Sequence, residues 1–271
     1  MTTTLFLQIL FSFILGGGLI TFLSLVAEKA NEKIAGIILM FPSTIVLGFF
    51  FLGITTSAEK VASIIPATII PLGIVVFSSV IYIHTAQFYS NYIPTKIKQI
   101  VATFITSSLL WFVLTSPFAI WKFKNLVIGV IGYFFLALIA HYILNRKKNM
   151  KPILKPVYSR AQILLRALFM GTIISIVVLL GKTLNLFWGG IFTMFPAATF
   201  ASLIILHFYY DPNQLFFFMR KAPIGSLSLF IYALSVMMLY PLIGIMFGTI
   251  AAYTICLLFS ILLIKYQQKL I

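Results

Sequence analysis

Two short segments combine a proline with hydroxylated residues inside otherwise apolar sequence. Pro42 is followed by Ser43 and Thr44, and Pro196 is followed by two alanines and then Thr199. Proline lacks an amide hydrogen and clashes with the carbonyl group four residues earlier, so each proline weakens a helix that contains it. The helix N-terminus created there would point amide groups and the positive end of its dipole at a ligand. These five residues are therefore candidate substrate-binding residues, and kinks that only shape helix packing are the alternative.

Residues suited to catalysis or metal binding are scarce. The acidic residues are Glu28, Glu32, Glu59 and Asp211, each near a predicted helix end or loop, and the single cysteine is Cys256. One cysteine excludes an intrachain disulfide and a cysteine-based metal site. No spacing typical of a serine triad, a zinc enzyme or a phosphate-binding loop occurs. We expect no catalytic residue, no metal and no cofactor.

The two prolines belong to an internal repeat. Met-Phe-Pro occurs at 40–42 and at 194–196, each time four residues after a glycine, Gly36 or Gly190, and the same offset of 154 pairs Gly17 with Gly171. Self-similarity at a fixed offset indicates two copies of one structural unit. Glycine lets helix backbones approach closely, so we expect these four glycines at helix seams. Close packing is the simpler interpretation, and movement along the same seams is compatible with it.

Composition places these residues in membrane helices. Hydrophobic residues make up 62% of the chain and charged residues 8%, whereas a soluble domain has about 25% charged residues. Continuous apolar runs near 20 residues long predict transmembrane helices rather than barrel strands. We predict an all-α polytopic bundle of about nine helices, at residues 5–26, 34–54, 62–84, 99–117, 125–144, 161–181, 186–207, 223–239 and 242–264.

The order of the helices predicts an inverted repeat. Four helices in residues 1–117 form repeat 1, residues 118–160 hold a connecting helix and a basic cytoplasmic loop, and residues 161–271 form repeat 2. With the connecting helix included, equivalent helices of the two units are five helices apart. Because five is odd, the two units cross the membrane in opposite directions, as in many transporters. The match weakens after the second helix, where Pro66 and Pro223 align only with an insertion of about three residues.

The charge distribution gives an orientation. The net charge is +15, and alternating helices place all but Lys60, Lys122, Lys124 and Lys182 of the 19 Lys and Arg residues on one side. This asymmetry predicts an external N-terminus and a cytoplasmic C-terminus in a plasma or bacterial inner membrane. We therefore expect contact with anionic lipids at the cytoplasmic face and no binding of nucleic acid.

Glu28 and Lys182 occupy equivalent positions in the two repeats, on opposite faces, and are candidate charges at the two mouths of a pathway. Solvated loop charges are the alternative. His84, His141 and His207 fall near predicted helix ends, where we expect interfacial anchors. Trp111, Trp121, Trp188 and Tyr240 are expected in the aromatic belts at the membrane interfaces.

The second helix of each repeat resembles the small multipass membrane proteins of the GlpM-like family, in which a four-helix unit carries a glycine followed by an FPS or FPT turn. Residues 36–44 (GIILMFPST) fit this pattern, and residues 190–199 (GIFTMFPAAT) fit it with Ala197 in place of serine. The resemblance covers about one motif per repeat. It implies a duplicated four-helix membrane unit and no particular substrate.

The repeat, the paired prolines and the lack of acidic residues within the predicted helices favour a secondary transporter or permease. Its solute would be small and anionic or neutral, or a lipid headgroup, bound near the membrane midplane. A homo-oligomer is compatible with this composition. One alternative is a lipid-acting membrane enzyme, for which Asp211, Asn213, Arg220 and His207 are the candidates. Another is a non-catalytic assembly or stabilising subunit, which needs no site.

Overall fold

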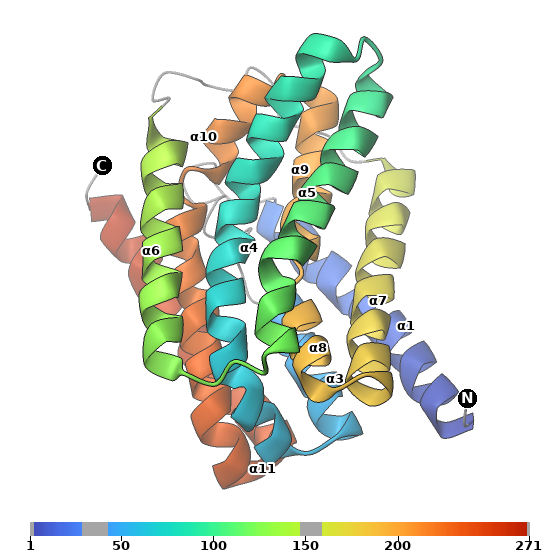
Figure 1. Ribbon diagram of the computed structural model, residues 1–271, viewed down its shortest axis with the longest axis vertical. Helices are drawn as coiled ribbons and strands as arrows, with labels where there is room; N and C mark the ends of the chain where they lie inside the picture. Colours follow the sequence, from blue (N-terminus) through green and yellow to red (C-terminus); the bar gives the residue numbers. More distant parts are fainter. Residues whose placement is uncertain (1–2, 29–42, 147–158, 270–271) are drawn as a thin grey trace.

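The computed structural model describes residues 3–28, 43–146 and 159–269, and within these ranges the chain is helical, without strands (Figure 1). Its elements are α1 (Thr3–Glu28), α3 (Ser43–Thr55), α4 (Ala58–Tyr92), α5 (Lys96–Ile120), α6 (Leu126–Asn145), α7 (Arg160–Thr183), α8 (Leu186–Thr193), α9 (Ala197–Tyr209), the 3-10 turn η1 (Pro212–Gln214), α10 (Leu215–Met219) and α11 (Ala222–Lys269). The predicted all-helical class is confirmed.

Six helical segments in the described ranges are long and apolar enough to cross a membrane. They are α4, α5, α6, α7, α8 taken together with α9, and α11 as far as Tyr266, and shorter apolar stretches lie in α1 and α3. The nine predicted runs fall on helical segments: the last two lie within α11, and the run 186–207 covers both α8 and α9. The part of the second run before Ser43 lies outside the described residues. These lengths and compositions are those of a multipass membrane protein.

α4 is the central helix of the bundle. It packs against α5, α6, α8 and α11 (Figure 1), and most of its side chains are buried. A helix that is apolar on all faces is stable only when other helices or lipid surround it. α4 begins earlier than predicted because Ser57 caps it, its Oγ accepting a hydrogen bond from the Lys60 amide at 3.3 Å.

α11 consists of two antiparallel halves that meet at Gly244. Gly244 has φ 76° and ψ 177°, a conformation available essentially only to glycine. In Figure 1, α11 turns back on itself at the lower end of the bundle. The halves are joined by buried hydrogen bonds from Cys256 Sγ to the Ser228 carbonyl, at 3.2 Å, and from Ser260 Oγ to Ser228 Oγ, at 2.8 Å. The two predicted runs 223–239 and 242–264 lie in these two halves.

Three side chains predicted at the membrane interfaces are buried instead. Tyr240 is fully buried, and its hydroxyl lies 2.7 Å from that of Thr249. Trp111 is 1% exposed and makes edge contacts with the rings of Phe192 and Phe195. His207 is fully buried, with Nδ1 3.4 Å from the Tyr82 hydroxyl. The prediction was wrong because nearness to a helix end does not reveal burial. α4 covers the end of α9, and α5 places Trp111 against α8.

Candidate functional site

The helix that carries the second Met-Phe-Pro motif is broken rather than kinked. α8 ends at Thr193, where the amides of Met194 and Phe195 bond to carbonyls only three residues earlier, at 2.9 and 3.0 Å. Pro196 follows with ψ 48°, outside the helical range, and α9 starts at Ala197. A proline cannot donate the amide bond that would join the two helices. The weak point predicted at Pro196 is therefore a complete break.

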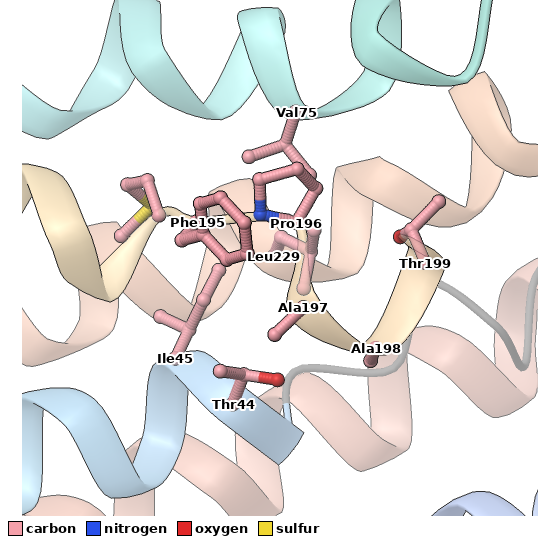
Figure 2. Close-up of a pocket in the computed structure, with 10 residues that line it drawn as sticks. Thr44, Ile45, Val75, Phe195, Pro196, Ala197, Ala198, Thr199 and Leu229 are labelled. Carbon is pink, nitrogen blue, oxygen red and sulfur yellow. The ribbon is translucent and has the colours of Figure 1, made fainter. Parts of the chain in front are cut away.

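The start of α9 faces the start of α3 across a small cavity. Thr44 and Ile45 of α3 lie opposite Pro196, Ala197, Ala198 and Thr199, and Val75 of α4 and Leu229 of α11 complete the enclosure (Figure 2). The structure thus brings together the predicted residues Thr44, Pro196 and Thr199. Pro42 lies outside the described residues, as does the side chain of Ser43, whose backbone begins α3.

The cavity walls come from corresponding places in the two halves of the sequence. Thr44 and Ile45 are separated by 154 residues from Ala198 and Thr199, the offset that pairs the two FP motifs. Val75 and Leu229 lie on α4 and α11, whose sequences align only after an insertion of about three residues. These two residues were not predicted, because their apolar side chains carry no local sign of facing a cavity.

The described lining carries no charged side chain, and its side-chain hydroxyls are those of Thr44 and Thr199. The first amides of an α-helix have no acceptor within their own helix, and the helix dipole adds a partial positive charge there. Pro196, at the N-cap of α9, has no side-chain oxygen with which to cap these amides, and the Ala197 amide bonds instead to the Phe195 carbonyl at 2.7 Å. The positive end of the α9 dipole at the cavity favours polar or anionic groups over cations.

The cavity is small in this conformation. Its volume is about 30 Å³, enough for one or two water molecules. Small-molecule sites occupy about 300 Å³ or more. A solute could bind between α3 and α9 only if the surrounding helices moved apart.

Gly17 and Gly171 lie where α1 crosses α7. A Cβ on Gly17 would overlap the carbonyl oxygen of Ala167, and a Cβ on Gly171 would lie 2.6 Å from that of Phe13. Ala167 precedes Gly171 by four residues, and Phe13 precedes Gly17 by four. The contact is therefore reciprocal: each glycine packs against the carbonyl group four residues before the other glycine.

Gly190 lies at a different helix contact. A Cβ there would lie 2.5 Å from Cδ1 of Ile64, so glycine lets α8 approach α4. Gly36 lies outside the described residues. Three of the four predicted glycines are thus at close helix contacts, and movement along these seams stays a prediction.

Lys182, one of the two predicted mouth charges, is not among the residues that line the cavity. Lys182 is exposed in the last turn of α7, where a cation is favourable to the helix dipole. Glu28 is the last residue of α1, and its side chain lies outside the described part of the chain. Their role at the ends of a pathway stays a prediction.

The residues considered for a lipid-acting enzyme make structural contacts. Asp211 forms a capping box with Gln214 at the start of η1, and Asn213 accepts a hydrogen bond of 2.8 Å from Gln87 of α4. The Arg220 guanidinium lies 4.5 Å from the centre of the Phe217 ring. Among the described residues, no three His, Cys, Asp or Glu side chains gather as a metal site requires.

Comparison of the chain with protein-family models, with curated proteins and with solved structures finds no match. Membership of the GlpM-like family is therefore a proposal that depends on the two glycine and FP motifs.

Proposed function

We propose that the protein is a secondary transporter or permease with a substrate site between the starts of α3 and α9. The observation that carries this proposal is one cavity lined by the start of α9 and by the first described turn of α3, the two segments that follow the FP motifs in the sequence. Transporters commonly bind solutes at such breaks, because a broken helix offers unpaired backbone groups within the membrane.

An inverted repeat would account for the helix packing. The first helices of the two units, α1 and α7, cross at equivalent glycines, and the third helices, α4 and the first half of α11, pack together. A two-fold axis in the membrane plane would relate these pairs and pass close to the cavity. We propose on this basis an arrangement of four, one and four helices, with the N-terminus outside.

The proposed solute is small and anionic or neutral, or is a lipid headgroup. The positive end of α9 favours an anion or a hydrogen-bond acceptor, and Thr44 and Thr199 place hydroxyl groups at the cavity. The small cavity would have to widen to hold such a solute. Exposure of the site to either side would then come from movement of one unit against the other.

Transport by the purified protein in liposomes tests this proposal. We would measure uptake of labelled phosphate, acetate and glycerol into loaded liposomes, and compare the native chain with Thr44→Val and Thr199→Val. Valine keeps the shape of threonine and removes its hydroxyl group. For the solute that is transported, we expect both variants to raise KM by roughly tenfold, the effect of one lost hydrogen bond of about 1.5 kcal/mol.

Thr115→Val is the matched control. The Thr115 hydroxyl is buried and bonds to the Trp111 carbonyl within its own helix, at 2.8 Å, so its loss should leave KM unchanged. Failure of either site variant to change KM would contradict the site. Product formation from lipid without transport would support a lipid-acting enzyme, and neither activity would support an assembly subunit.

A further inference from the structure

A second hollow lies on the side of the bundle, where α5, α7 and α9 meet. Its volume is about 410 Å³, more than ten times that of the central cavity. Among the described residues that line it, Gln162 alone is polar. We call this hollow the lateral groove.

The lateral groove is long and open to the side. Its lining runs from Ile97 to Phe104 on α5 and from Gln162 to Phe169 on α7, which is about 10 Å along each helix. Ile97 and Leu165 on its two rims are 63% and 64% exposed, whereas Ala201 on its floor is buried. An elongated apolar hollow that opens toward lipid suits an acyl chain.

Aromatic rings close the inner end of the lateral groove. Phe104 and Phe169 at that end contact each other, with ring centres 5.7 Å apart, and also contact Phe200 and Phe195 respectively. Phe195 lines the central cavity. The rings therefore separate the groove from the cavity, so a chain in the groove would end there.

Two exposed cations lie at the outer end. Lys98 follows the groove residue Ile97 in the first turn of α5, and Arg160, the first residue of α7, precedes the groove residue Gln162 by two positions; neither side chain is among those that line the groove. The helix dipole disfavours cations at these positions, so helix stability does not explain them. The nearby Lys96 differs, because its Nζ donates a hydrogen bond of 2.9 Å to the Tyr210 carbonyl.

We propose that the lateral groove binds an anionic phospholipid. One acyl chain lies along α5, α7 and α9, and the phosphate lies between Lys98 and Arg160. An apolar hollow with a cationic mouth matches a lipid rather than a free phosphate ion, which would gain nothing from the apolar walls. This site is separate from the proposed transport site and does not depend on it.

Lipid retention by the full-length protein tests the proposal. Purified protein would be exposed to equal amounts of phosphatidylglycerol and phosphatidylcholine, and bound lipid would be counted by native mass spectrometry. We expect one tightly held phosphatidylglycerol. Ala201→Trp, which fills the groove floor, should abolish its retention. Lys98→Gln and Arg160→Gln should each weaken phosphatidylglycerol binding by roughly fivefold, as expected for one interfacial cation.

Two controls match these changes. Leu138→Trp introduces the same side chain at an exposed position on α6, and Lys124→Gln removes an exposed cation before α6, at the opposite end of α5. Both should retain the lipid. Equal loss in a control and its groove variant would overturn the site, as would unchanged retention in both charge variants. A dimer that Ala201→Trp dissociates, without lipid loss, would show a second copy of the chain in the groove.

Discussion

Prolines have opposite consequences in two helices of this protein. Pro196 separates α8 from α9, whereas Pro66 and Pro71 lie inside α4, which continues through both. In membrane helices the carbonyl freed by a proline is often satisfied by neighbouring groups, so the helix can persist. A proline alone therefore does not predict a break. The recurrence of Met-Phe-Pro in both halves was the more informative signal.

Replacement of Pro196 distinguishes a functional break from a packing kink. If the break forms the substrate site, Pro196→Ala should restore an amide donor, preserve or raise the melting temperature and reduce transport by roughly tenfold or more. If the proline only shapes packing, stability and transport should fall together. Thermal unfolding and liposome uptake, measured on the same purified variant, separate these outcomes.

Pro71→Ala is the control for that experiment. Pro71 is buried in the continuous helix α4, so its replacement restores an amide without closing a break, and transport should be retained. An equal transport loss in Pro71→Ala and Pro196→Ala would remove the support for a site at Pro196.

Residue types and spacing predicted part of the candidate site. The repeat identified Thr44, Pro196 and Thr199, which line one cavity. It did not identify Phe195 or Leu229, because an apolar side chain in an apolar helix carries no local sign of facing a cavity. The same limitation explains Trp111 and His207, whose burial depends on which helix covers them.

At the scale of helices, the repeated glycines predicted a contact between two helices that the hydrophobic periodicity of each helix could not predict. The chain is apolar around most helix surfaces, so no polar stripe indicates which face meets which neighbour. The offset paired Gly17 with Gly171, and α1 and α7 cross at these residues. The length of α4 was underestimated because its end turns contain polar residues that lie beyond the apolar run.

The crossing of α1 and α7 predicts matched stability losses. Gly17→Ala and Gly171→Ala should each lower the free energy of unfolding by about 1–3 kcal/mol, because the added methyl group overlaps a backbone carbonyl and forces the helices apart. The double variant should cost less than the sum of the two, since the crossing is already opened by the first change. Thermal and denaturant unfolding in detergent measure these effects.

Gly18→Ala is the neighbouring control. A Cβ at Gly18 meets nothing within 4 Å, so alanine should leave stability unchanged or raise it by up to about 1 kcal/mol through its higher helix propensity. A loss at Gly18 equal to that at Gly17 would show that helix propensity or lipid exposure, not the crossing, governs this part of α1.

For the whole molecule, the two ends of the helix bundle differ in their exposed cations, because successive helices run in alternate directions. Lys98, Arg146 and Arg160 are exposed at the ends of α5, α6 and α7 on one side. Lys60 and Lys124 are exposed at the starts of α4 and before α6 on the other. This division could be predicted from the sequence, because the prediction needs only the positions of the charged residues and the number and order of the helices. The preference of Lys and Arg for cytoplasmic loops predicts that the cation-rich side faces the cytoplasm.

Single cysteines test that orientation in intact cells. Cys256 is the single cysteine of the chain. In a Cys256→Ala background, labelling therefore reports only the introduced cysteine. Lys60→Cys, Lys124→Cys and Lys182→Cys should react with an impermeant maleimide added outside. Lys98→Cys and Arg160→Cys should react only after the membrane is permeabilised, because they lie at the cation-rich end. Labelling at Lys98→Cys but not at Lys124→Cys in intact cells would reverse the orientation, and labelling at both would contradict a single orientation.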